Sequence, residues 1–337
     1  MAPKPTGGYS FDELEKEVRR YLSDVAHEGD VSQALKEIQA AAEKVRKITK
    51  SITRASLTRA AKAGFEISGG VVREPAASDP HQAPDARPLL TGDEGESQKA
   101  HSVQANLLPS APPSLPGFDI AALYRFCHEV GGDYFDFIPL PDGRTALVVA
   151  DASGKGVPAA MVMVMLRSIL RLVAANAHDP VETLVHTNRL LMPDMLRGMF
   201  VTALYVVIDP VAREMVLVNA GHYPPIIWRP RLSGTRVVNI RGPALGLLDT
   251  QRFAANISRK TLALEPGDCL CFYTDGVPEA KNLLGEEFGE RRLARAFRDH
   301  ATQPAQKIVD AIVAAVDAHS EETPQHDDIT VLAMRVL

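Results

Sequence analysis

Cysteine and tryptophan are scarce in this 337-residue chain, which has three cysteines and one tryptophan. The cysteines are odd in number, and Cys269 and Cys271 stand one residue apart in a strand-like run, which suits neither a disulfide framework nor a zinc site. The chain also lacks an apolar signal core and any apolar run long enough to span a bilayer. With 37 basic and 42 acidic residues, its formal net charge of -5 gives no general attraction to nucleic acid or anionic membrane. We therefore expect a cytoplasmic protein that binds neither.

The N-terminal part of the chain, residues 1–66, has the pattern of two amphipathic helices. Apolar residues recur at three- and four-residue steps from Phe11 to Val25 and again from Val31 to Ile52, with HEGD as the break between them. Two helices cannot bury both apolar stripes against each other alone. We expect a helical, coiled-coil-like hairpin that forms a homodimer with a second copy, with docking of a partner protein as the alternative.

The rest of the chain divides into a linker, a connector and one large domain. Residues 67–93 are rich in Pro, Ala, Gly, Asp and Ser and are typical of a flexible linker. Residues 94–116 form a connector that is helical until Pro109. Residues 117–337 alternate apolar strand-like runs with helical segments and predict an α+β domain of layered sheets and helices. Strands are expected near residues 118–126, 145–150, 200–209, 214–220, 268–274 and 328–336, and helices near 157–176, 181–196, 290–300 and 305–319.

Aspartates end or begin several of these strand-like runs. Asp133 lies in EVGGDYFDF and Asp151 in VVADASGKG, while CFYTDG carries Asp275 and HDDIT carries Asp327. A buried carboxylate needs a compensating cation or hydrogen-bond donors, and no basic residue stands beside Asp133. Hard divalent ions take oxygen ligands, and a pair of ions needs several carboxylates. The combination therefore predicts a metal site.

Strand alternation limits which aspartates can share that site. Asp133 and Asp136 would point to opposite faces of an extended strand, and the same holds for Asp327 and Asp328. We therefore expect one member of each pair to face the metal.

The ordered set of motifs resembles the PPM-type metal-dependent serine/threonine phosphatases, specifically their SpoIIE/RsbU branch. The resemblance runs from about Ser97 to Leu337. Its elements are NLLPSAPPSLPGFDIAALY, EVGGDYFDF, VVADASGKGVPAAMVM, MFVTALYVVID, VNAGHYPP, GPALGLL, LEPGDCLCFYTDGVPEA and HDDITVLAMRV. It implies an α-β-β-α sandwich of two antiparallel sheets with a centre of two Mn²⁺ or Mg²⁺ ions at one end.

The resemblance also implies residue roles, substrate and partner. The implied metal ligands are the carboxylates of Asp133, Asp151, Asp275 and Asp327 or, less favoured, Asp328, together with the backbone carbonyl of Ala152. Asp133 and Asp151 are the implied catalytic residues, with Asp151 bridging both ions. The implied reaction is direct attack of a metal-activated water on phosphoserine or phosphothreonine. The implied partner is a STAS-type anti-sigma-factor antagonist in a partner-switching pathway.

Several alternatives are open at this point. The SGKG segment resembles part of a phosphate-binding P-loop, but it lacks the first glycine and the final Ser or Thr of that motif. A P-loop is therefore rejected. GGDYF has Tyr134 where the GGDEF-type cyclic-dinucleotide synthases require an acidic residue. His222 in NAGH is either a general acid or, more favoured, a residue that stabilises a turn. A catalytically inactive phosphatase domain acting as sensor or scaffold is the remaining alternative to an enzyme.

Overall fold

The computed structural model describes residues 66–68, 71–73, 94–177, 179–232 and 234–337. The predicted N-terminal helices and most of the predicted linker lie outside these residues, so the expected homodimer contacts lie outside them too. Two short strands, β1 (Glu66–Ser68) and β2 (Val71–Arg73), pair antiparallel where the linker was expected to start. The domain boundaries themselves stay a prediction.

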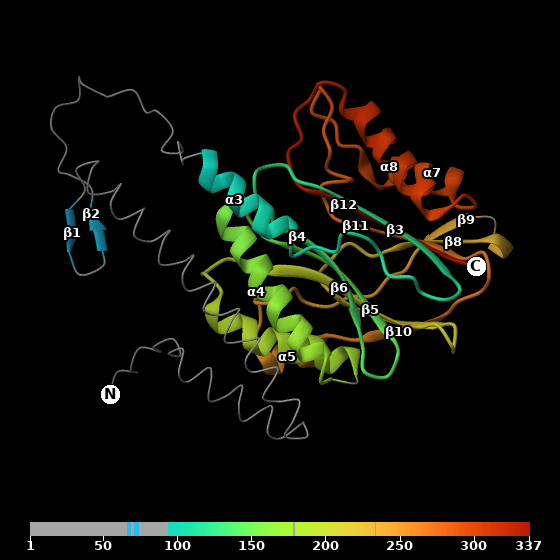
Figure 1. Cartoon of the computed structure of the whole chain (residues 1–337), viewed down its shortest axis with the longest axis horizontal. Coiled ribbons are helices and arrows are strands. Elements are labelled where there is room, and N and C mark those ends of the chain that lie inside the picture. The colour runs from blue at the N-terminus through green and yellow to red at the C-terminus, as the bar shows by residue number, and fades with distance from the viewer. Residues whose placement is uncertain (1–65, 69–70, 74–93, 178, 233) are drawn as a thin grey trace. The chain divides into compact units, whose positions relative to one another are not determined.

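Two five-stranded antiparallel sheets form the domain that follows (Figure 1). In spatial order, the first sheet contains β10 (Arg259–Ala263), β7 (Glu214–Ala220), β6 (Val201–Asp209), β5 (Thr145–Ala152) and β4 (Asp133–Pro139). The second contains β3 (Phe118–Arg125), β12 (Ile329–Val336), β11 (Cys269–Tyr273), β8 (Ile226–Arg229) and β9 (Gly234–Val237). The six strands given by range from the sequence are confirmed, and so is the strand-like run that carries Asp133, which is β4, while β8, β9 and β10 were not foreseen.

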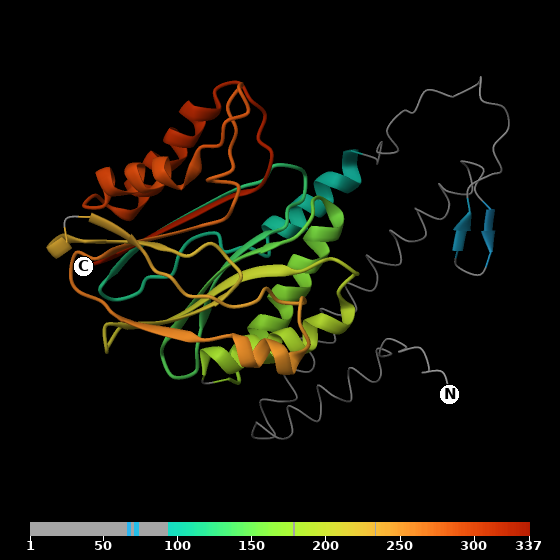
Figure 2. The same cartoon turned by 180° about the vertical axis from the view of Figure 1, so that it is seen from behind.

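Helices cover the outer face of each sheet, as Figures 1 and 2 show from opposite sides. The first sheet carries α4 (Val157–Ala174), α5 (Pro180–Leu191) and α6 (Thr250–Asn256), and the second carries α7 (Gly289–His300) and α8 (Ala305–Ser320). Short 3-10 helices are η1 (Met192–Asp194) and η2 (Pro230–Leu232), and α3 (Glu94–Ala105) precedes the first strand of the domain. The predicted α-β-β-α sandwich is therefore confirmed.

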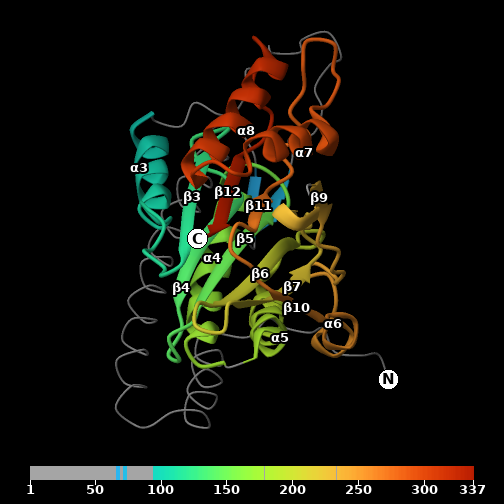
Figure 3. The ribbon, with the colours of Figure 1, turned by 90° about the vertical axis from the view of Figure 1, so that its right-hand side faces the viewer.

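Three apolar layers hold this arrangement together. One lies between α4, α5 and the first sheet, one between the two sheets, and one between the second sheet and α7 and α8 (Figure 3). Among the described helices, α4 is the one long and apolar enough to cross a membrane by length and composition. Its residues Met163, Leu166 and Leu170 are buried against the first sheet.

Alternation along β4 decides which side chains reach the site. Tyr134 belongs to the layer under α4, and Phe135 belongs to the layer between the sheets. Asp136 stands two residues after Tyr134 and points to the same side, toward α4. There Nε and Nη2 of Arg171 each donate a hydrogen bond of 2.6 Å to the Asp136 carboxylate. Asp133 takes the opposite direction, toward the second sheet. The prediction that Asp133 and Asp136 face opposite ways is confirmed.

The turn between β5 and α4 depends on glycine. Gly154 and Gly156 have φ of 98° and 67°, a backbone conformation that costs glycine little. Gly156 is the N-cap of α4, and a proline stands in the first turn of that helix. The helix therefore begins at Val157, as predicted from the sequence.

Candidate active site

Asp133 and Asp151 face each other where β4 begins and β5 nears its end. They are direct register partners in the antiparallel pair of strands. The Asp133 side chain is buried, and its Oδ2 accepts hydrogen bonds from Thr274 Oγ1 at 2.7 Å and Thr330 Oγ1 at 2.6 Å. Both threonines belong to the second sheet or its immediate end, so Asp133 connects the two sheets at this edge.

The predicted ligand carboxylates act strongly on one another. Burial, followed by the negative charges of Asp275 and Asp327, raises the pKa of Asp151 to about 8. Burial, followed by Asp327 and Glu279, raises the pKa of Asp275 to about 6. Burial and then Asp151 raise the pKa of Asp133 well above its usual range. The structure thus brings together carboxylates whose mutual repulsion a bound cation would relieve.

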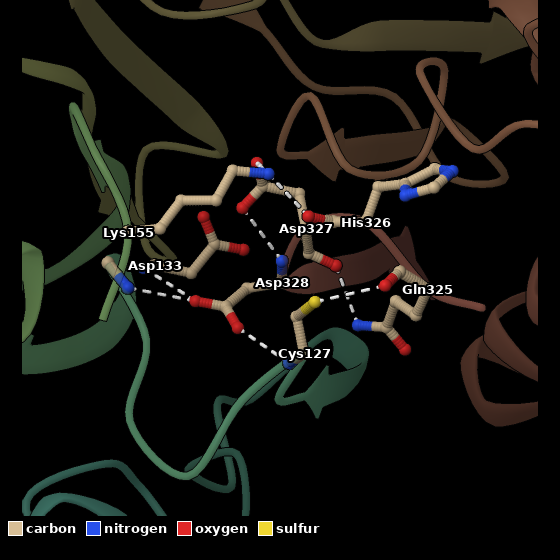
Figure 4. A network of polar contacts seen from close by, with 8 residues as sticks. Cys127, Asp133, Lys155, Gln325, His326, Asp327 and Asp328 are labelled. Atoms are coloured by element: carbon tan, nitrogen blue, oxygen red, sulfur yellow. Dashed lines mark hydrogen bonds and ion pairs between the residues drawn. The ribbon is translucent and has the colours of Figure 1, made fainter. Parts of the chain in front are cut away.

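The two neighbouring aspartates immediately before β12, Asp327 and Asp328, have different partners (Figure 4). Asp327 Oδ2 forms an ion pair with Lys155 Nζ at 2.9 Å. Asp328 is buried, and its Oδ1 and Oδ2 accept the backbone N–H groups of Cys127 and Gly132, each at 2.8 Å. The two side chains diverge as expected, although both residues lie just before β12 and not within a strand. Asp328 is occupied in holding the loop before Asp133.

The glycine pair of the GGD motif allows these close approaches. A Cβ atom on Gly131 would lie 1.9 Å from Asp328 Oδ2. A Cβ atom on Gly132 would lie 2.7 Å from the backbone oxygen of Ala152, the predicted carbonyl ligand next to Asp151. Only glycine therefore fits at either position without displacing backbone or a buried carboxylate.

The connector helix α3 also contacts this loop. Gln104 is buried, its Nε2 donates to the Gly131 carbonyl at 2.6 Å, and its Oε1 accepts the Gly131 N–H at 3.0 Å. Arg167 Nε of α4 donates to the carbonyl of Leu107, just beyond α3, at 2.7 Å. Gln104 was not predicted from the sequence, since a single glutamine on a polar helix carries no signal. Thr274 and Thr330 were not predicted either, although both stand within three residues of a predicted ligand.

His222 has the contacts of a structural residue. Its Nδ1 lies 2.8 Å from Thr202 Oγ1 and its Nε2 lies 3.1 Å from the Tyr273 carbonyl, so Nε2 carries the proton and Nδ1 accepts. Its backbone N–H and carbonyl are both bonded to the Asn219 side chain. Burial lowers the pKa of His222 to about 4, which keeps the ring neutral. These contacts support the turn-stabilising interpretation over a general acid.

The atoms that the predicted ligands offer are of the type that a hard divalent cation binds. The gathered groups are all oxygen donors, and no cysteine takes part. Within the residues that the structure describes, no group of three or more His, Cys, Asp or Glu side chains stands together as a formed metal site. Two of the carboxylates have other partners here, because Asp327 pairs with Lys155 and Asp133 accepts two threonine hydroxyls.

A family comparison assigns the domain. The model of the family described as Stage II sporulation protein E (SpoIIE) matches residues 141–337, more than half of the chain. The chain belongs to the SpoIIE family. The match begins after β4, so it includes Asp151, Asp275 and Asp327 but not Asp133.

Two individual proteins are similar to this SpoIIE-family chain over most of its length. It is 26% identical over 244 residues to the phosphoserine phosphatase RsbU of Bacillus subtilis, which covers 71% of this chain and 70% of RsbU. It is 29% identical over 269 residues to protein IcfG of Synechocystis sp., covering 71% of this chain but only 41% of IcfG. The chain thus matches less than half the length of that relative.

Solved structures show the same architecture. The SiaA-PP2C domain of Pseudomonas aeruginosa superimposes with a TM-score of 0.63 at 26% identity, over 72% of this chain and 97% of that domain. The RsbU and RsbW domains of Rv1364c from Mycobacterium tuberculosis superimpose with a TM-score of 0.57 at 29% identity, over 68% and 63% of the two chains. The sandwich described above is therefore that of a PP2C-type phosphatase domain.

Proposed function

We propose that this chain is a metal-dependent protein phosphatase that hydrolyses phosphoserine and phosphothreonine. The observation that carries the proposal is the group of carboxylates at one edge of the sandwich, where burial, followed by the negative charges of Asp275 and Asp327, raises the pKa of Asp151 to about 8. Such an arrangement is costly unless a cation occupies it. Membership of the SpoIIE family and similarity to a relative named phosphoserine phosphatase support the same reaction.

Two Mn²⁺ or Mg²⁺ ions are the proposed cofactors. The residues that would hold them are Asp133, Asp151, Asp275, Asp327 and the Ala152 carbonyl. Asp327 is preferred over Asp328, because both oxygens of Asp328 already accept backbone N–H groups. When bound, the ions would supply an activated water and neutralise the phosphoryl oxygens.

The protein's own residues would position this chemistry. Asp133 and Asp151 are the proposed catalytic carboxylates, fixed opposite each other by strand pairing. Thr274 and Thr330 restrict Asp133 to one orientation through its Oδ2. Preorganised groups of this kind lower the barrier because they need no rearrangement during the reaction.

The proposed substrate is a STAS-type anti-sigma-factor antagonist in a partner-switching pathway of the cytoplasm. Support comes from similarity to RsbU and to a structure that contains RsbU and RsbW domains in one protein. A catalytically inactive sensor or scaffold is the second candidate, because the described carboxylates would bind a cation in either case. Turnover separates the two.

A Mn²⁺ titration of the full chain with p-nitrophenyl phosphate tests the proposal. We expect turnover that depends on Mn²⁺, disappears with EDTA, and falls to background in Asp151→Asn while the circular dichroism spectrum is unchanged. Asp310→Asn removes a charge from an exposed position of α8 and serves as the matched control. Turnover that survives EDTA, or an Asp151→Asn variant with near wild-type rates, would contradict the metal mechanism. Mn²⁺ binding without turnover would favour the scaffold.

Homodimerisation through the N-terminal helices is also proposed, from the apolar spacing of Phe11–Ile52 alone. Replacing Leu35 and Ile38 together by aspartate would place charges in that interface and should give a monomer. Light scattering at micromolar concentration measures the mass of both proteins. A monomeric wild type would leave partner docking as the role of these helices.

A further inference from the structure

Lys155 is a basic side chain among the acidic groups of the site. It comes from the Gly154–Gly156 turn before α4 and reaches across to the segment just before β12 (Figure 4). There its Nζ pairs with Asp327 and also donates to the backbone carbonyl of His326. The proposed function assigns it no role.

A positive side chain at this edge would add to the charge that the proposed ions offer a phosphorylated substrate. The charges that surround Asp151 and Asp275 are mostly negative, including Glu279, and they would repel a phosphoryl dianion. Lys155 opposes them, because it lowers the pKa of Asp275. Lysine is a common phosphate-binding residue that acts as a compact positive charge.

The present contact of Lys155 leaves it able to change partners. Its side chain is 53% exposed and that of Asp327 is 39% exposed, so the ion pair between them is weak. The flanking turn is open, because a Cβ on Gly154 or Gly156 would meet no atom within 4 Å. A four-carbon side chain on such a turn can move its ammonium group without disturbing packing.

We propose that Lys155 is a phosphate-binding residue of this site, held by Asp327 until that carboxylate binds a cation. If Asp327 bound a cation, Lys155 would lose its carboxylate partner and would keep only the His326 carbonyl, so its ammonium group could turn to a phosphoryl oxygen. The inference rests on the proposed function, since it takes Asp327 as a ligand. It adds the residue that recognises the phosphoryl group, and it predicts that Lys155 opposes cation binding.

Calorimetric titrations of the full chain test both parts, first with Mn²⁺ alone and then with inorganic phosphate on the Mn²⁺-loaded protein. The variants are Lys155→Gln, Lys155→Arg and, as matched control, Lys281→Gln, which removes one exposed charge from another loop. We expect Lys155→Gln to weaken phosphate binding about tenfold, the effect of one charge-assisted hydrogen bond. Lys155→Arg should stay within about threefold of the wild type, because it keeps the charge and donors. Lys281→Gln should match the wild type.

The Mn²⁺ titration separates this role from a structural one. Removing a competing cation should make Lys155→Gln bind Mn²⁺ several-fold more tightly. Weaker Mn²⁺ binding would mean that Lys155 merely ties the two loops together, and would overturn the inference, as would equal phosphate affinity in Lys155→Gln and the wild type. Failure of the wild type to bind Mn²⁺ would instead overturn the proposed function.

Discussion

Replacing His222 with glutamine should make the domain more resistant to acid. The His222 ring is buried and neutral, donating to the Tyr273 carbonyl and accepting from Thr202. Glutamine has one donor and one acceptor group of similar reach, but it does not titrate. Near pH 7.5 the two proteins should therefore differ only modestly in free energy of unfolding.

The expected magnitude follows from the pKa of His222. Burial lowers it to about 4 in the folded protein, against an ordinary value of 6.5. Between these values the unfolded chain binds more protons than the folded one, so stability present above pH 6.5 is lost as pH falls toward 4. For these two pKa values the loss from His222 between pH 7.5 and 4.5 is about 2.5 kcal/mol. The glutamine variant should be spared this loss.

Urea unfolding of wild type and His222→Gln at several pH values between 7.5 and 4.5 measures the effect. Other groups titrate in the same range, and the raised pKa values of Asp151 and Asp275 give the opposite trend, favouring the metal-free folded protein as pH falls. The difference between the two proteins cancels those shared contributions. Parallel stability curves over the whole range would refute the buried, neutral histidine. Such curves would make a general-acid role for His222 a candidate again.

Three further perturbations test other parts of the domain. Gly132→Ala should abolish phosphatase turnover, because its Cβ would lie 2.7 Å from the Ala152 carbonyl oxygen; a variant with wild-type rates would show that this backbone approach is unimportant. Arg171→Met should lower the free energy of unfolding by about 3 kcal/mol, because it leaves the buried Asp136 carboxylate without its cation. The expected loss is at the low end for a buried ion pair, since the Arg171 side chain is partly exposed. Urea unfolding should show that adding Asp136→Leu restores part of this free energy. Gln104→Ala should raise the Mn²⁺ concentration for half-maximal turnover, because the loop before Asp133 loses both of its amide contacts; an unchanged titration curve would limit α3 to a structural role.

Local patterns in the sequence determined much of this domain. Short apolar runs made the predicted strands recognisable. The period of two along a strand placed Asp133 and Asp136 on opposite faces, as their contacts with Thr330 and Arg171 confirm. Glycine and proline marked the start of α4. These features depend on residues close together in the chain, and steric preferences of the backbone act over the same short distances. They are therefore visible before any folding is considered.

Only the tertiary structure decided which groups meet at the site. The Lys155–Asp327 ion pair and the Thr330–Asp133 hydrogen bond each join residues more than 170 positions apart, and the Gln104 contact with Gly131 joins α3 to a loop beyond β3. No local periodicity encodes such pairs, since they form when two separate sheets pack face to face. The same packing gives the site its electrostatics, because burial, followed by carboxylates that stand beside β11 and β12 of the second sheet, raises the pKa of Asp151 on the first sheet. The residue types in the sequence predicted a cluster of carboxylates, and the packing of the two sheets determined the partner of each carboxylate.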